Sequence, residues 1–114
     1  MTEIENLEEH RKIAQETVAK RDEVLKLYEN DVFKRVVIEG FCRDEAVRCA
    51  NAAGNPGIEE RDEKQLLQMS MAGGHLVRYL RTIIQQGDAS EGSIKEIDEH
   101  LDAMRADNAD EIEA

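Results

Sequence analysis

The first thirty residues carry a heptad stripe that is too narrow for a helix to fold stably on its own. Apolar or aromatic residues fill six of the eight positions spaced alternately three and four apart, which are Ile4, Leu7, Arg11, Ala14, Val18, Arg21, Leu25 and Tyr28. A stripe this narrow, interrupted by two arginines, gains little from packing on a broad core. Thr2 and Glu5 form a capping box at the start, and Asn30 marks the end. The pattern therefore predicts a helix over residues 1–30 that pairs with another helix.

A second narrow stripe lies in the last quarter of the chain. Ser93 and Glu96 form a capping box there. Apolar residues then recur at spacings of three and four, namely Ile94, Ile97, Leu101 and Met104. We predict an acidic helix over residues 90–114, paired with the helix over residues 1–30 as an antiparallel, coiled-coil-like arm. The pattern fades after Met104, so residues 106–114 are expected to fray unless a partner orders them.

The segment DVFKRVVIEGFCRDEAVRCANAAGN, which follows the first helix, indicates two short helices joined at Gly40. Asp31 and Asp44 are placed to cap their N-termini. An Asn-Pro-Gly turn ends this part of the chain at residue 57, so the two helices and the turn are assigned to residues 31–57. The β-branched run over residues 36–38 also fits a short strand, although no second strand is available to pair with it.

Residues 58–87 contain the stretch GGHLVRYLRTIIQQG and are predicted to form one long helix. Gly73 falls on its apolar stripe, whose members are Leu66, Met69, Gly73, Leu76, Leu80 and Ile83. A phosphate cradle needs glycines at a helix N-terminus, where N–H groups are free, whereas this periodic pattern passes through Gly73 and Gly74. Each glycine inside a helix costs about 1 kcal/mol relative to alanine. We therefore predict that the pair permits close approach of a neighbouring helix.

Composition favours long amphipathic helices over a sheet. Of the 114 residues, 36% are charged, 40% are hydrophobic and only 4% are aromatic. We expect a single all-α domain over residues 1–114, a helical bundle whose long terminal helices form the arm. Both phenylalanines lie in the neutral middle of the chain, where we expect the core. Its predicted members are Phe33, Val36, Val37, Phe41, Val47, Leu66, Leu76, Leu80 and Ile83.

The net charge of −11 is concentrated toward the C-terminus. Residues 87–114 carry ten acidic and two basic side chains, whereas residues 30–86 carry eight of each. Direct binding to duplex nucleic acid is not expected, because phosphate neutralisation needs clustered Lys and Arg. Two interpretations of the acidic helix stay open: it faces a basic partner surface, or it keeps the protein in solution.

No catalytic, metal or cofactor site is recognisable in the sequence. The three histidines are isolated and no cysteine pair has zinc-ligand spacing. Glu96 and His100 lie four residues apart, whereas the di-iron motif requires three. Cys42 and Cys49 are separated by about 10 Å along a helix, too far for a disulfide, so both are predicted to be reduced. We expect neither enzymatic activity nor a bound cofactor.

The best candidate for a specific partner contact is a cluster in the third helix, made of His75, Arg78, Tyr79 and Arg81. Arg78 and Arg81 lie three residues apart and can present a shared guanidinium face to a carboxylate or phosphate. Tyr79 supplies the amphipathic surface typical of interfaces. The alternative is that these arginines pair with the abundant Glu and Asp residues of neighbouring helices.

Two pieces of the chain carry a recognisable combination of motifs, DVFKRVVIEGFCRDEAVR and HLVRYLRTIIQQGDASEGSIKEIDEHLDAMR. An Asp-x-Phe-Lys element, a Gly-aromatic step and a Glu-Ala-x-Arg helix are followed by a Tyr-x-Arg-Thr-Ile run that ends in Gly. This combination resembles a family of small, mostly uncharacterised helical proteins of tailed bacteriophages. The matching positions are Phe33, Lys34, Gly40, Phe41, Glu45, Ala46, Arg48, Tyr79, Arg81, Thr82, Ile83 and Gly87. The resemblance implies a phage setting rather than an activity, and Cys49 departs from it, because similar sequences have Leu there.

Three functions are consistent with these patterns. The first is a non-enzymatic structural or assembly protein of a phage particle, in the head, at the portal and neck or in an assembly intermediate, whose partners are other phage proteins or copies of itself. The second is an early inhibitor that binds a basic host protein through the acidic C-terminal helix. The third is a small DNA-packaging subunit, which would need a basic face. No run approaches the roughly 18 apolar residues of a membrane span, so a soluble protein is expected. The resemblance to phage proteins implies that it lies in the host bacterial cytoplasm during infection and is then incorporated in the virion.

Overall fold

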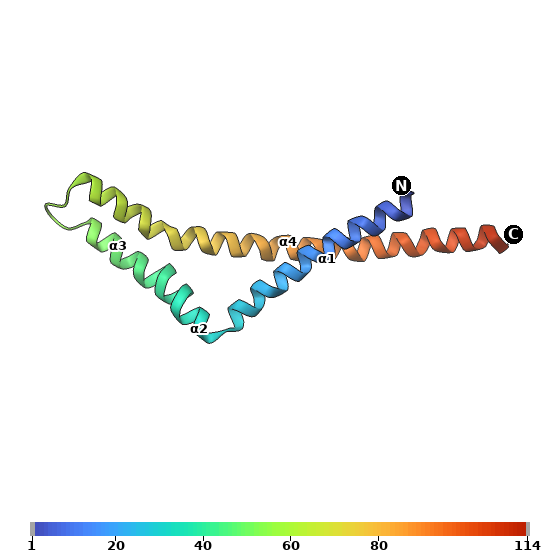
Figure 1. Ribbon diagram of the computed structural model, residues 1–114, viewed down its shortest axis with the longest axis horizontal. Coiled ribbons are helices and arrows are strands. Elements are labelled where there is room, and N and C mark those ends of the chain that lie inside the picture. The colour runs from blue at the N-terminus through green and yellow to red at the C-terminus, as the bar shows by residue number, and fades with distance from the viewer. Residues whose placement is uncertain (1, 114) are drawn as a thin grey trace. The chain divides into compact units, whose positions relative to one another are not determined.

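The computed structural model describes the backbone of residues 2–113 and the side chains of residues 2–110. Its elements, in chain order, are α1 (Glu3–Glu29), α2 (Asp31–Phe33), the π-helical stretch η1 (Lys34–Glu45), α3 (Ala46–Ala53) and α4 (Glu60–Glu113) (Figure 1). No strand occurs in this part of the chain, and residues 36–38 are helical. The all-α prediction is confirmed.

Two compact units divide the chain. Residues 1–23 and 83–114 form the first, which we call the arm, and residues 24–82 form the second, which we call the head. The first part of α4 therefore belongs to the head, and the part from Ile83 onward belongs to the arm.

The arm consists of α1 packed antiparallel against α4, as the two narrow stripes predicted. Ion pairs join the two helices in reverse chain order, because Glu8 pairs with Arg105 whereas Arg21 pairs with Asp88. The buried side chains of the arm are Ala14, Arg21, Ile83 and Leu101. At the start of α1 the capping box is present: the Glu5 N–H donates to Thr2 Oγ1 at 3.1 Å, and the Thr2 N–H donates to Glu5 Oε2 at 3.2 Å.

In the head, residues 31–53 form one helical segment. The chain then reverses direction in a turn and continues into α4 (Figure 1). Asn30 caps this segment, because its Oδ1 accepts a hydrogen bond from the Phe33 N–H at 2.9 Å. The rings of Tyr28 and Phe33 pack edge to face with centroids 5.9 Å apart. The turn before α4 contains Gly57 at a φ of +81°, a left-handed conformation that suits glycine.

The predicted break at Gly40 was wrong, because the chain stays helical through η1 with neither a loop at Gly40 nor a cap at Asp44. η1 has the wide turn of a π-helix, with hydrogen bonds that reach five residues back. A Cβ built at Gly40 would lie 3.1 Å from the carbonyl oxygen of Arg35, five residues earlier. Glycine at this position therefore accommodates the wide turn rather than ending a helix.

The wide turn also changes which residues face inward, and this overturns part of the predicted core. Val36, Phe41 and Val47 are 58%, 43% and 55% exposed. The prediction assumed about 3.6 residues per turn, whereas a π-helical turn takes roughly four to five, so the inward positions drift along the sequence. The buried or half-buried residues of this segment are instead Phe33, Val37, Ile38, Gly40, Cys42, Glu45, Ala46, Cys49, Ala52 and Ala53. Of the other predicted core residues, Leu80 and Ile83 are buried and Leu66 and Leu76 are half-buried.

The predicted boundary between helices over residues 58–87 and 90–114 was also wrong. α4 runs without a break from Glu60 to Glu113, and Ser93 donates a hydrogen bond to the Ala89 carbonyl at 3.2 Å instead of capping a new helix. Gly87 is buried within α4, where it serves packing rather than a helix end. The backbone is helical through residues 106–113 as well, where fraying was expected.

Gly73 is the point of closest approach between α4 and η1 in the head. A Cβ built at Gly73 would overlap Cys42 Cα and lie 3.0 Å from Cys42 Cβ, so no larger residue fits without moving the backbone. Gly73 thus has the close-packing geometry that its place on the apolar stripe predicted. Gly74 does not, because a Cβ there would meet nothing within 4 Å.

We predict opposite effects for alanine at these adjacent positions. Gly73→Ala is expected to lower the free energy of unfolding by about 1–3 kcal/mol, because the methyl group overpacks the contact with Cys42. Gly74→Ala is expected to raise it by about 0.5–1 kcal/mol, because alanine loses less backbone entropy in a helix. Urea unfolding followed by circular dichroism measures both, and equal effects of the two substitutions would contradict the assignment of Gly73 as the contact.

Candidate functional site

The best-defined polar site of the arm lies where α1 crosses α4 at Gly87. A Cβ built at Gly87 would overlap Arg21 Cβ and lie 2.7 Å from both Arg21 Cγ and Cδ. The aliphatic part of the arginine therefore lies flat on the glycine, and the residue is 8% exposed. Since Arg21 occupies a core position of the heptad stripe, its burial follows from the helix pairing itself.

Three carboxylates surround the guanidinium of Arg21. Its Nη1 donates to Asp88 Oδ1 at 2.9 Å and to Glu91 Oε2 at 2.7 Å. Its Nε and Nη2 both donate to Asp22 Oδ1, at 3.1 and 3.0 Å. These hydrogen bonds, the one to Glu91 first, raise the pKa of Arg21 above its ordinary value. One guanidinium thus joins carboxylates of α1 and α4, and it is itself buried between the helices, so the cluster suits fixing the register of two helices rather than binding a ligand.

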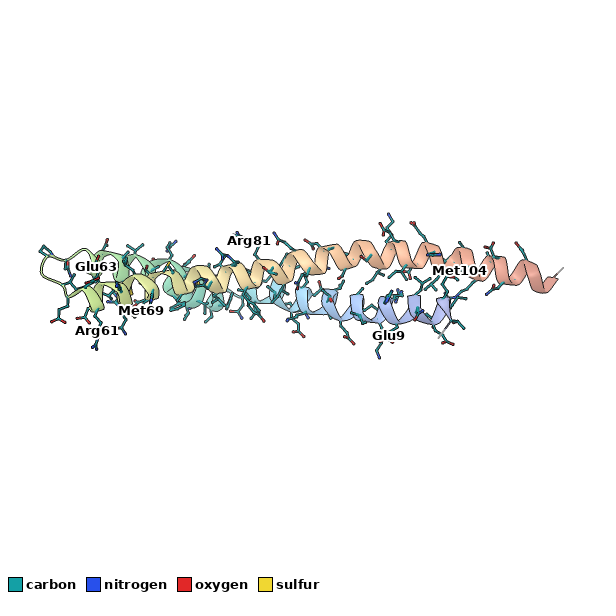
Figure 2. All side chains as sticks on the ribbon, turned by 90° about the horizontal axis from the view of Figure 1, so that it is seen from above. Glu9, Arg61, Glu63, Met69, Arg81 and Met104 are labelled. Carbon is teal, nitrogen blue, oxygen red and sulfur yellow. The ribbon has the colours of Figure 1, made fainter. Side chains whose placement is uncertain are left out.

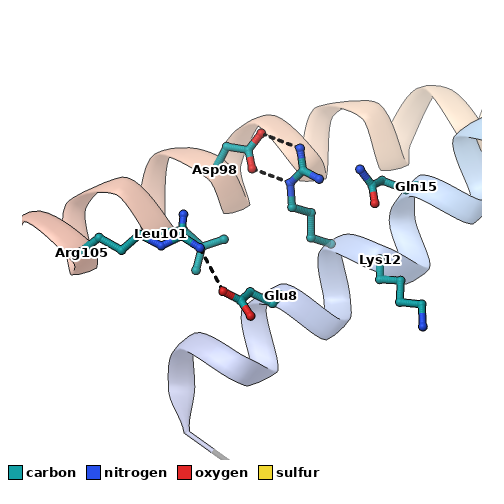
Figure 3. Close-up of a pocket in the computed structure, with 7 residues that line it drawn as sticks. Glu8, Lys12, Gln15, Asp98, Leu101 and Arg105 are labelled. Carbon is teal, nitrogen blue, oxygen red and sulfur yellow. Dashed lines mark hydrogen bonds and ion pairs between the residues drawn. The ribbon is translucent and has the colours of Figure 1, made fainter.

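A shallow groove farther along the arm contains the second ion-paired arginine (Figure 3). Arg11 Nε and Nη2 donate to the two carboxylate oxygens of Asp98 at 2.6 and 3.3 Å, and Arg105 Nη2 donates to Glu8 Oε1 at 2.9 Å. The hydrogen bond and charge of Arg11 hold the pKa of Asp98 below its ordinary value. Leu101 packs beneath these pairs at 2% exposure. Each carboxylate of the groove already faces an arginine, and Lys12 is left as a lining charge without an ion pair among the described residues.

The four residues predicted to contact a partner are all exposed on α4, but they do not form one cluster. At about 100° per residue, Tyr79 and Arg81 point to opposite sides of the helix. His75 and Arg78 do come together, lining a small hollow with Met71 and Gly74. Of the predicted group, Arg78 and Arg81 share a face, as expected for a spacing of three.

Charge and exposed apolar surface are distributed unequally between the two units. The head carries nine acidic and nine basic residues, whereas the arm carries seventeen acidic and six basic ones, which accounts for the whole net charge of −11. Among the described side chains, ten of the eleven large apolar ones that are exposed belong to the head; they are Leu25, Leu27, Val32, Val36, Phe41, Val47, Leu67, Met69, Met71 and Tyr79. The head is therefore the unit with uncovered apolar surface.

The described residues contain no group of three or more His, Cys, Asp and Glu side chains placed to hold a metal ion. Cys42 and Cys49 are both free thiols. Burial raises the pKa of Cys42, which disfavours the reactive thiolate. Cys49 is fully buried, and its thiol donates to Glu45 Oε1 at 3.6 Å.

Among the helices that the structure describes, none is long and apolar enough to cross a membrane.

Comparisons of the chain with models of protein families, with curated proteins and with solved structures found no match.

Sequence reasoning singled out Arg21 only as an interruption of the heptad stripe and took Gly87 for a helix end. A signal for the site was nevertheless present. Gly87 is followed by Asp88 and Glu91, so one face of a helix carries a glycine with two carboxylates one and four residues later. An arginine at a core heptad position needs both space for its aliphatic part and carboxylates for its guanidinium group. Only a joint reading of the two stripes would have paired these residues.

Truncation of Arg21 is expected to destabilise the arm. Arg21→Ala leaves three carboxylates close together without their cation and leaves a void over Gly87. We expect the melting temperature to fall by several degrees. Arg61→Ala is the charge-matched control, because Arg61 is exposed and makes no ion pair among the described residues. Thermal melts followed by circular dichroism compare the two, and a drop no larger than that of the control would show that the cluster is dispensable.

The pair between Arg11 and Asp98 is expected to contribute stability above acidic pH only. Because the folded pKa of Asp98 is lowered, its contribution is complete above the unfolded value of about 3.9 and is lost as the pH falls through the folded value. Asp98→Asn should therefore destabilise the protein at pH 7, and the difference from wild type should shrink below about pH 4. Asp107→Asn, on an exposed side chain, changes the net charge equally and serves as the control. Urea unfolding across this pH range provides the measurement, and a penalty that is independent of pH would rule out the charge as its cause.

Proposed function

We propose that the protein is a non-enzymatic structural or assembly protein of a tailed-phage particle that acts through helix-mediated contacts with other proteins. The observation that carries the proposal is the division between an electrically neutral head with uncovered apolar side chains and an arm that holds the whole net charge. Apolar side chains exposed together on one unit are typical of a surface that another protein covers.

The arrangement of the helices supports a scaffold more than a ligand-binding protein. The polar groups of the arm that resemble a site, around Arg21 and Arg11, are paired with one another inside the chain. Their interactions hold two helices in register, which is the task of a structural element. The phage setting rests on the resemblance of residues 31–48 and 75–105 to small phage proteins. Under this proposal the protein is present in the host cytoplasm during infection and then in the particle.

A second candidate function is supported by the C-terminal half of the arm. Five of its carboxylates are exposed without an ion pair among the described residues, namely Glu96, Glu99, Asp102, Asp107 and Asp110. A row of free carboxylates along a helix attracts a basic protein surface and binds it in a salt-sensitive manner. An inhibitor of a host nucleic-acid-binding protein would use this surface rather than the head.

Quantitative mass spectrometry of purified mature particles and purified proheads separates these functions. A structural component is expected in mature particles at a fixed copy number, because symmetric assemblies contain fixed numbers of each subunit. Presence in proheads alone would identify an assembly factor. Absence from both would contradict the structural proposal and favour the inhibitor.

A further inference from the structure

α4 has a second face in the head, opposite the one that packs on η1. Gly73, Leu76 and Leu80 point toward the core, and a helix places residues at spacings of three and four on one side. The opposite side carries a stripe with the same spacing, which we call the outer stripe: Glu60, Glu63, Leu67, Met71, Gly74, Arg78 and Arg81. Every member of it is exposed. Figure 2 shows Glu63 and Arg81 on one side of α4 and Met69 on the other.

The middle of the outer stripe has the features of a helix-packing surface, although none of the described helices packs on it. Leu67 and Met71 are 42% and 54% exposed. Gly74 follows them with nothing within 4 Å of a Cβ built there, and it lines a hollow with Met71, His75 and Arg78. The same helix uses Gly73 to receive η1 and Gly87 to receive α1. An interior helical glycine costs about 1 kcal/mol relative to alanine, and no contact with the described residues offsets that cost at Gly74.

The two ends of the outer stripe carry opposite charge in mirrored positions. Glu60 and Glu63 lie at one end, and Arg78 and Arg81 lie at the other. Glu60 is as far from the middle of the stripe as Arg81, and Glu63 is as far as Arg78, the midpoint in both cases falling between Ser70 and Met71. Leu67 and Gly74 are also equally distant from this point. Two bases lie near the acidic end: Lys64, which pairs with Glu60 at 3.3 Å, and Arg61, which is not a member of the stripe.

We infer that the outer stripe binds the outer stripe of a second copy of this chain, with the two α4 helices antiparallel and a two-fold axis between Ser70 and Met71. In that register Leu67 of each copy lies over Gly74 of the other, so a large side chain fills a gap. Glu60 faces Arg81 and Glu63 faces Arg78 across the interface. A two-fold interface requires one surface to be complementary to itself, and the mirrored charges of this stripe meet that requirement.

The charge balance of the molecule favours a second copy over an unrelated partner. The head has no net charge, so two heads approach without net repulsion, whereas two arms at −11 each repel one another. A basic partner would find no excess of acid on the head, and an acidic partner would find no excess of base. This inference rests on the proposed function in one respect, that the protein works through helix contacts, and it names the partner and the face.

A charge-swap experiment on the full chain tests both the partner and the register. Sedimentation velocity is measured for the wild type, for Glu60→Arg/Glu63→Arg, for Arg78→Glu/Arg81→Glu, and for an equimolar mixture of the two variants. We expect the wild type to dimerise and each variant alone to dimerise about tenfold more weakly or worse, because like charges then face each other. The mixture is expected to restore dimerisation, because every pair across the interface is again opposite in charge.

Two further variants keep the test decisive if a charge reversal disturbs folding. Met71→Cys places a thiol beside the axis, so mild oxidation should link two chains by a disulfide, whose Cα atoms lie about 4.4–6.8 Å apart. Met69→Cys, on the other side of the helix, is the matched control and should not link. Gly74→Leu should weaken dimerisation without lowering the melting temperature of the monomer, because the space around Gly74 is open.

A wild type that stays monomeric at high concentration, or a mixture no more dimeric than its components, would overturn the inference. Equal crosslinking at residues 69 and 71 would overturn the register. None of these results affects the structural role, which the composition of purified particles decides separately.

Discussion

The arrangement of this protein depends on the absence of a Cβ atom at two positions of α4. At Gly73 the backbone of η1 reaches the helix through Cys42, and at Gly87 the stem of Arg21 lies on it. Helix axes normally stay about 8–10 Å apart because side chains separate them. Removing one side chain at each contact lets a chain with few large apolar residues bring its helices together. Several of the buried residues have small side chains, namely Ala14, Cys49 and Ala53. The helices therefore pack through close approach of their backbones rather than through large apolar side chains.

In the arm, the close approach of α1 and α4 is combined with ion pairs between them. Arg11 and Arg21 occupy heptad positions that usually hold apolar residues, and each finds carboxylates on α4. Buried or half-buried ion pairs add little net stability compared with apolar residues. They do penalise other registers, because a shifted pairing would place an arginine against an apolar neighbour without its carboxylate. The heptad stripe of α1 therefore buries little apolar area, but its arginines specify the register in which α1 pairs with α4.

The sequence was sufficient to predict the all-α class, the helix over residues 1–30, the antiparallel arm and the role of Gly73, because each follows from the periodicity of apolar residues. Thr2 with Glu5 and the turn at Gly57 were likewise local signals. The inward face of residues 34–45 could not be predicted, because a π-helical turn leaves no recognised mark on composition and shifts the phase of every residue after it. Gly87 was misassigned for a different reason. A glycine before a polar stretch is typical of a helix end, and only the opposite helix shows that it is a contact.

Because Arg21 packs on Gly87, substitutions at these two positions are coupled in evolution. A larger residue at 87 has no room while a long side chain lies across it, and a shorter residue at 21 leaves both a void and uncompensated acids. Divergence at this crossing therefore has to pass through linked changes that also include Asp88 and Glu91. Among homologues that keep the arm, these four positions should vary together or not at all, whereas the exposed face of the same helix is free to drift.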